Sequence, residues 1–385
     1  MRSIRRRAQL AAVAACSLSA TLLLPGAAQA VEVTATLQVV AEGLNAPRGL
    51  VYDRAHGRVL VAEAGVVAQN TGPCGFAERG LPMCFGLSGS VFEYSESGPA
   101  GAAGPADAAG RRIVTGLPST ALQGGPTVVI GLHDLSLRDG DQLVASFGLL
   151  GSKPYRESLG AGAAALGQLA KINDSGKVRP FADVATFIDQ RYPNHLESDP
   201  YGVATGDYGT VIANAGGHTS QGNNLLLVRH DGTIIELAQF PDRPSLTDPT
   251  DTITAVPTTV AQGPDGAFYV GELTGAPFYP NEARVWRVVP GQAPTVHAQG
   301  FTTIIDLAFD DQGRLVVLQT GANPFDNTLD GALIRIEPDG QRTTLASAGL
   351  RNPGGVAVAA PGVFYVTTFN ASGGGVGQLV RVTLN

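Results

Sequence analysis

Apolar residues recur along this chain in short runs that tight polar turns separate. The repeated pattern is Pro-x-Gly, an alternating apolar segment, a turn rich in Gly and Asp, and a second apolar segment that ends on a polar residue. The clearest copies span 47–65, 200–216, 257–275 and 353–369, and weaker copies span 132–148 and 304–321. Short runs rich in Val, Ile, Tyr and Phe between such turns predict β-strands. Their period indicates a stacked or radial repeat.

Each copy extends to a unit of four strands. In the unit that begins near residue 200, we expect strands at 201–205, 210–213, 224–229 and 233–239. Four-stranded antiparallel units that repeat around an axis make a β-propeller. The sequence therefore predicts an all-β fold, a six-bladed β-propeller whose first strands begin near residues 47, 132, 200, 257, 304 and 353.

The last unit stops one strand short. Its third strand is expected at 378–383, and the chain ends at Asn385. The N-terminal segment 34–42 has the alternation of a strand but no unit of its own. We expect it to occupy the missing fourth place and close the ring, because an unpaired sheet edge invites aggregation.

With one exception, the Gly- and Ala-rich segment 95–110, the longer connecting segments belong to one end of the predicted ring. Turns between first and second strands are tight, as at 54–57 and 206–209, whereas longer segments follow second strands or precede first strands, as at 64–87 and 185–199. Antiparallel alternation places these longer segments on the same face. Loops that a rigid scaffold displays often carry function, so we predict that this face binds a ligand or partner.

Polar residues gather where the first strands begin at that face. We predict that they surround the channel mouth as ligand-binding residues: Arg48, His133, Asp134, Tyr201 and Asp306. His133 beside Asp134 fits an acid–base pair, or a histidine held for structural reasons. The chain lacks the Gly-x-Ser-x-Gly, Gly-x-x-x-x-Gly-Lys and His-Glu-x-x-His motifs. Catalytic residues are therefore left unassigned.

The second strand of each unit also ends on a polar residue. The six are Glu63, Ser146, Asn214, Glu272, Gln319 and Thr368. They either cap the ends of the sheets or form a ring of ligands. In the second interpretation Glu63, Asn214 and Glu272 are candidate metal ligands, because Ca²⁺ prefers carboxylate and amide oxygens. Calcium is the cofactor that we consider.

The first residues have the features of a signal peptide. Four arginines precede the apolar stretch 10–24, and Ala28-Gln29-Ala30 has the small-x-small form of a cleavage site. We expect a signal peptide over residues 1–30 and a secreted or extracytoplasmic propeller over residues 31–385. Both general and twin-arginine export fit this segment. A lipoprotein attached through Cys16 is an alternative.

The net charge limits the classes of partner, and the cysteine content predicts a disulfide. Removal of the signal peptide takes the net charge from −7 to −11 with histidine neutral, which argues against binding to nucleic acid or anionic lipid. No later apolar run is long enough to span a bilayer. Cys74 and Cys84 remain, and a pair of cysteines in an exported protein predicts a disulfide. We expect a monomer.

Three segments resemble the ScyD/ScyE family of exported bacterial propellers. They are Glu197-Ser-Asp-Pro-Tyr-Gly-Val-Ala204, the stretch 256–275, which contains Pro-Asp-Gly and Phe-Tyr-Val-Gly-Glu, and Thr303-Ile-Ile-Asp-Leu-Ala-Phe309. The resemblance runs from about residue 38 to the end of the chain, with extra sequence between Cys74 and Cys84. It implies a six-bladed propeller outside the cytoplasm. It carries no established reaction, so it transfers no functional residues.

The functional expectation is a secreted scaffold that binds a small ligand, or a protein or glycan partner, on its loop-bearing face. The alternative is a Ca²⁺-dependent lactonase of the gluconolactonase type. Such lactonases hold Ca²⁺ at the channel with Glu, Asn and Asp, and Glu63, Asn214 and Asp306 fall at loosely similar blade positions. An enzyme of this kind needs at least three of its ligands around one point.

Overall fold

The computed structural model describes residues 33–77, 80–96, 110–124, 127–138, 142–173, 175–193, 197–217 and 221–385. The predicted signal peptide and the lipoprotein alternative at Cys16 lie outside these residues. The compact unit Val33–Asn385 is built almost wholly from strands. Within the described residues, no helix is long and apolar enough to cross a membrane.

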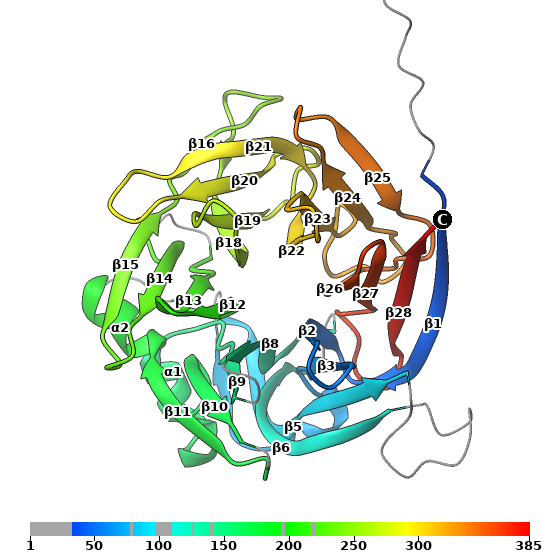
Figure 1. The fold of residues 1–385 in the computed structure, drawn as a ribbon. Helices are drawn as coiled ribbons and strands as arrows, with labels where there is room; N and C mark the ends of the chain where they lie inside the picture. The colour runs from blue at the N-terminus through cyan, green and yellow to red at the C-terminus, as the bar shows by residue number, and fades with distance from the viewer. Residues whose placement is uncertain are drawn as a thin grey trace, which may run out of the picture. The chain divides into compact units, whose positions relative to one another are not determined.

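Six antiparallel sheets surround a central axis in the described part of the chain (Figure 1), which confirms the predicted six-bladed propeller. The first blade contains β2 (Pro47–Asp53), β3 (Arg58–Glu63), β5 (Pro82–Ser95) and β6 (Arg111–Leu122), with β4 (Cys74–Phe76) beside β5 and β7 (Val129–Ile130) beside β6. The second contains β8 (Leu132–Arg138), β9 (Gln142–Phe147), β10 (Gln168–Ile172) and β11 (Val178–Asp183). The third contains β12 (Pro200–Gly206), β13 (Gly209–Asn214), β14 (Asn224–Val228) and β15 (Ile234–Gln239).

The remaining three blades follow the same order from the axis outward. The fourth contains β18 (Ala255–Gln262), β19 (Phe268–Thr274), β20 (Ala283–Val288) and β21 (Thr295–Phe301). The fifth contains β22 (Ile304–Phe309), β23 (Leu315–Gln319), β24 (Ala332–Ile336) and β25 (Arg342–Ala346). The sixth contains β26 (Gly355–Ala360), β27 (Val363–Thr368), β28 (Gly377–Leu384) and β1 (Ala35–Leu44). The blades begin where the sequence repeat predicts them.

The N-terminal strand closes the ring, as the sequence predicts. β1 pairs antiparallel with β28, with Ala35 opposite Leu384 and Leu44 opposite Gly377. In Figure 1 the blue β1 lies along the outer side of the red β28. The sixth blade thus draws strands from both ends of the propeller.

Apolar side chains fill the spaces between neighbouring blades. One cluster joins Leu60 and Val91 of the first blade to Leu132 and Phe147 of the second. Another joins residues of the fifth blade, such as Leu333, to residues of the sixth. Each of these side chains is almost wholly removed from water, and burial of a large apolar side chain contributes roughly 1.5–3 kcal/mol. Packing between blades therefore stabilises the ring and fixes its inner strands.

Two short helices, which the strand pattern does not predict, occupy the long segments around the second blade in the described residues. α1 (Lys153–Ser158) begins after Ser152, whose hydroxyl accepts a hydrogen bond from the Tyr155 N–H, and α2 (Val184–Arg191) begins after Asp183. The Arg156 guanidinium donates to both oxygens of Asp183, at 2.9 and 2.8 Å. The two-stranded β16 (Arg243–Pro244) and β17 (Thr252–Ile253) lie outside the blades.

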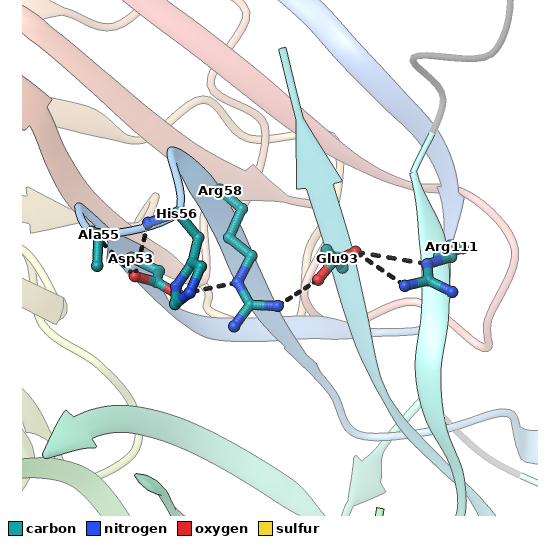
Figure 2. A network of polar contacts seen from close by, with 6 residues as sticks. All are labelled: Asp53, Ala55, His56, Arg58, Glu93 and Arg111. Atoms are coloured by element: carbon teal, nitrogen blue, oxygen red, sulfur yellow. Dashed lines mark hydrogen bonds and ion pairs between the residues drawn. The ribbon is translucent and has the colours of Figure 1, made fainter. Parts of the chain in front are cut away.

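A chain of ionic contacts ties the strands of the first blade together (Figure 2). Asp53, near the turn after β2, accepts hydrogen bonds from His56 at 2.7 Å and Arg58 at 2.8 Å. Arg58 also donates to Glu93 of β5 at 2.6 Å, and Arg111 of β6 contacts the same carboxylate at 3.4 Å. Burial acts to raise the pKa of Asp53, but the bonds from Arg58 and His56 outweigh it and lower that pKa. This network therefore holds the strands of the first blade together.

Candidate functional site

A cavity of about 380 Å³ opens at the end of the propeller that carries the longer loops. It is bounded by the first residues of inner strands and by the loops that follow second strands. Most of its lining is apolar and includes Val128, Ile130, Val256, Leu273, Phe278 and Phe325. Its charged and hydroxyl-bearing residues include Arg48, Glu197, Asp199, Tyr201 and Thr274. A concave apolar site with few polar groups is typical of small-molecule binding.

Arg48 and Tyr201 form the polar part of the cavity that the sequence singles out. They lie near the starts of β2 and β12, on different blades. Arg48 Nη1 donates to the Tyr201 hydroxyl at 3.0 Å, and Arg48 Nη2 donates to the Val129 carbonyl at 2.8 Å. The guanidinium carbon lies 6.0 Å from the centre of the Tyr201 ring. These contacts fix the guanidinium at the cavity wall.

His133 lies beside this pair and is completely buried. Its ring centre is 4.4 Å from that of Tyr201, and its Nδ1 is 3.8 Å from Asp199 Oδ1. Burial, and then the charge of Arg48, hold the pKa of His133 well below its usual value. The Pro200 backbone acts to raise the pKa, but it does not reverse the shift. Neither ring nitrogen has a hydrogen-bond partner among the described atoms. The imidazole is therefore neutral at physiological pH.

Asp199 shares a tightly packed corner with His133. Its Oδ1 accepts hydrogen bonds from the backbone N–H groups of Leu149 at 2.8 Å and Leu150 at 3.2 Å. A Cβ added to Gly148 would lie 2.2 Å from His133 Cε1 and 2.5 Å from Asp199 Oδ1. Glycine at this position is therefore what lets the imidazole and the carboxylate approach the backbone.

Two aromatic side chains stand at the rim of the cavity. Phe278 follows β19 and Phe325 follows β23, and their rings meet edge to face with centres 5.9 Å apart. Phe278 has φ +62°, in the left-handed region that bulky residues rarely adopt. Side chains held in such conformations cluster at ligand sites.

Asp134 and Asp306 lie deeper in the channel than Arg48 and Tyr201. Both line a second cavity of about 270 Å³ between the inner strands. Asp134 accepts hydrogen bonds from the Leu135 and Val203 N–H groups, both at 2.8 Å. Asp306 accepts from the Val356 N–H at 2.7 Å, the Leu307 N–H and the Thr259 hydroxyl. Each aspartate thereby links its own inner strand to that of the next blade.

The candidate metal ligands do not meet at the channel. Glu63 is buried and binds Arg112 of β6 at 2.7 and 2.8 Å, together with Ser90 and the Asn45 N–H. Glu272 contacts Arg243 and accepts a hydrogen bond from Trp286 Nε1 at 2.6 Å. Asn214 accepts a hydrogen bond from Ser198 and donates one to the Gly222 carbonyl at 2.8 Å.

These placements differ from the expectation that the five ligand-binding candidates surround one channel mouth and that Glu63, Asn214 and Glu272 share a metal ion. Arg48 and Tyr201 line the mouth with His133 behind them, Asp134 and Asp306 lie deeper, and Glu63 and Glu272 serve as partners of buried or half-buried arginines. Among the described residues, no three His, Cys, Asp or Glu side chains are arranged to hold a metal ion. The physical reason is that a buried carboxylate needs an ionic or hydrogen-bonding partner, and distant arginines provide it.

The predicted disulfide is confirmed and lies beside the cavity. Cys74 of β4 and Cys84 of β5 are opposite each other in the strand pairing and are bonded. Leu81, which lines the cavity, belongs to the loop that this bond closes. The segment between the two cysteines therefore supplies part of the cavity wall.

Several lining residues escaped the sequence analysis. Glu197 and Asp199 precede β12, and their place before a predicted inner strand was a usable signal. The apolar wall residues Val128, Phe278 and Phe325 lie in loops, where alternation gives no direction to a side chain.

No family model and no curated protein matches this chain. Solved structures do match it across most of its length. A gluconolactonase from Xanthomonas campestris aligns with a TM-score of 0.53 and 11% identity, over 91% of this chain and 90% of its own. The PQQ-bound aldose sugar dehydrogenase from Streptomyces coelicolor aligns with a TM-score of 0.53 and 13% identity, over 91% and 99% of the two chains. A luciferin-regenerating enzyme aligns with a TM-score of 0.50 and 10% identity, over 91% and 95%. At these identities the similarity establishes the propeller fold.

Proposed function

We propose that this chain is an exported β-propeller that binds a small, largely apolar molecule in the cavity at the loop-bearing end. The observation that carries the proposal is the cavity itself, about 380 Å³ in volume, with apolar walls and polar groups contributed by Arg48, Tyr201 and Asp199. A site of this size and composition holds a molecule of drug-like dimensions. No reaction is assigned to it.

Two observations support export. The Cys74–Cys84 disulfide suits an oxidising compartment, and the first 30 residues have the features of a signal peptide. The ScyD/ScyE resemblance points the same way, and membership of that family is part of the proposal.

The alternative of a Ca²⁺-dependent lactonase receives less support from the geometry. Its three expected ligands already have partners: Glu63 is engaged by Arg112, Asn214 accepts a hydrogen bond from Ser198, and Asp306 accepts backbone N–H bonds from Leu307 and Val356. The gluconolactonase and sugar dehydrogenase neighbours share the propeller scaffold, which hosts many unrelated activities. We therefore favour the binding function.

Binding of N-phenyl-1-naphthylamine, a neutral apolar fluorophore, tests the proposal. We expect saturable fluorescence enhancement by the mature protein at one site. Ala276 lines the cavity and is exposed at its rim, so Ala276→Trp should fill the cavity without disturbing the core. We expect this variant to weaken binding at least tenfold, which corresponds to about 1.4 kcal/mol.

Ala293→Trp provides the matched control, because Ala293 lies in an exposed turn between β20 and β21. It should bind the fluorophore like the wild-type protein. Absence of saturable binding to the wild-type protein, or equal binding by the two tryptophan variants, would overturn the proposed site.

A further inference from the structure

Arg48 has more hydrogen-bond donors than the protein uses. A guanidinium carries five N–H donors, and the described contacts of Arg48 are one to the Tyr201 hydroxyl and one to the Val129 carbonyl. Its Nε is buried without a hydrogen-bond partner. Both acceptors are neutral groups, and no carboxylate of the described residues forms an ion pair with Arg48. A positive charge therefore borders a largely apolar cavity without a negative partner.

Tyr201 adds a further donor next to this guanidinium. Its oxygen accepts the hydrogen bond from Arg48 Nη1, which leaves the hydroxyl proton for another acceptor. Burial is the main cause that raises the pKa of Tyr201 above its ordinary value, so the hydroxyl keeps its proton at neutral pH. The Thr274 hydroxyl, which also lines the cavity, is buried without a hydrogen-bond partner.

The acidic residues that line the cavity contact neighbours other than Arg48. Asp199 accepts two backbone N–H bonds and lies near His133. Glu197 is buried against Gly217, where an added Cβ would come within 1.4 Å of Glu197 Oε2. Neither of these carboxylates forms an ion pair with Arg48 within the described part of the chain, so the guanidinium charge is not neutralised by them.

We propose that the cavity selects an amphipathic carboxylate, with the carboxylate on Arg48 and Tyr201 and the apolar body between the loop residues. The planar guanidinium fork matches the two oxygens of a carboxylate, and the unused N–H groups of Nη1 and Nη2 supply the two bonds. The apolar body contacts Val128, Ile130 and Val256, with Phe278 and Phe325 at the rim. This inference rests on the proposed function and specifies the class of ligand.

A matched pair of probes tests it. Calorimetric titration of the mature protein with 2-naphthylacetic acid and with 2-naphthylacetamide at neutral pH compares a carboxylate with a neutral group of nearly equal shape. We expect the acid to bind at least tenfold more tightly. That preference should decrease as the salt concentration rises, because ions screen the attraction between partly exposed charges.

Three variants locate the effect. Arg48→Met should weaken binding of the acid at least tenfold and change binding of the amide less than threefold. Arg48→Lys keeps the charge but loses the fork, so it should retain part of the preference. Tyr201→Phe should weaken the acid about threefold to tenfold. The control is Arg54→Met, which removes an exposed arginine of the same blade that donates to the Ala359 carbonyl and should leave both affinities unchanged.

The outcomes distinguish failure of the carboxylate assignment from failure of the proposed binding function. Equal affinities for acid and amide, or an acid affinity that survives Arg48→Met, would overturn the carboxylate assignment while leaving the apolar cavity as a binding site. Failure of both naphthyl probes and of N-phenyl-1-naphthylamine would overturn the proposed function as well. If Arg48→Met does not fold, the wild-type preference for the acid and the reduced preference of Arg48→Lys decide.

Discussion

Asp134 and Asp306 show how a side chain at the channel can serve the ring. Each accepts backbone N–H bonds from the inner strand of the next blade. Burial raises the pKa of Asp306 to about 6, against the effect of its hydrogen bonds. Burial, and then the charge of Asp306, raise the pKa of Asp134 well above its usual value. The two carboxyl groups therefore retain protons that exposed aspartates have already released.

Asp306→Asn should change the pH dependence of stability. Between about pH 4 and pH 6 the folded protein holds a proton on Asp306 that the unfolded chain releases, so the free energy of unfolding falls as pH rises through this range. The loss amounts to about 2 kcal/mol. Denaturant unfolding between pH 4 and 7 should show a flatter profile for Asp306→Asn than for the wild-type protein. Asp134→Asn should flatten it as well, and parallel profiles for all three proteins would contradict the assignment.

The segment that the Cys74–Cys84 disulfide closes contributes to the cavity wall. β4 pairs with β5 alone, and Leu81 of this segment lines the cavity. The segment is held at one side of the first blade. Its order should therefore depend on the bond between Cys74 and Cys84.

Replacement of both cysteines by serine should loosen this segment selectively. Closure of so short a loop limits the stabilisation to about 3 kcal/mol in the chain-entropy model. We expect proteolysis between residues 74 and 84 to accelerate at least tenfold and the affinity for N-phenyl-1-naphthylamine to fall several-fold. The far-ultraviolet circular dichroism spectrum should stay unchanged. Cleavage at the wild-type rate, with unchanged affinity, would show that the bond does not order the cavity wall.

The strands of the blades follow from local sequence, whereas the helices and the cavity walls do not. Alternation and tight turns determine β12 to β15 almost to the residue, because both are set by neighbours in sequence. α1 and α2 are too short to form alone, and the Arg156–Asp183 pair that joins them depends on the folded chain. Loop side chains such as Phe278 and Phe325 are likewise placed by tertiary contacts.

The candidate site shows the same division. Arg48 and Tyr201 could be placed at the channel mouth from sequence, because the start of every inner strand lies at the same end of the channel. Glu63 and Glu272 could not be assigned, because a strand-end side chain turns toward its partner. Arg112 lies 49 residues after Glu63 in the chain, and Arg243 lies 29 residues before Glu272.

Closure by β1 makes the stability of the whole propeller depend on its N-terminal strand. Leu44 at the end of β1 is completely buried and packs with Leu50, Tyr365 and other residues of the first and sixth blades. Gln38 of the same strand is exposed. A change at Leu44 therefore tests closure, and a change at Gln38 tests the strand surface.

Leu44→Ala should lower the free energy of unfolding by about 2–4 kcal/mol, because it removes buried methyl groups and leaves a cavity. Gln38→Ala should change it by less than about 0.5 kcal/mol. Urea unfolding followed by circular dichroism measures both. Equal, small effects of the two substitutions would show that the ring does not rely on β1 for its stability.

The pairing of β1 with β28 also sets the time at which the protein can fold. Ala35 and Leu384 stand almost a whole chain apart in sequence, and a ribosome makes the first of these strands long before the last. Closing so large a loop adds little to its entropic cost compared with a loop of half the length, but contacts between distant residues slow folding. We therefore expect the nascent chain to stay incompletely folded until β28 has been made, a delay during which its unpaired strands are open to binding by chaperones.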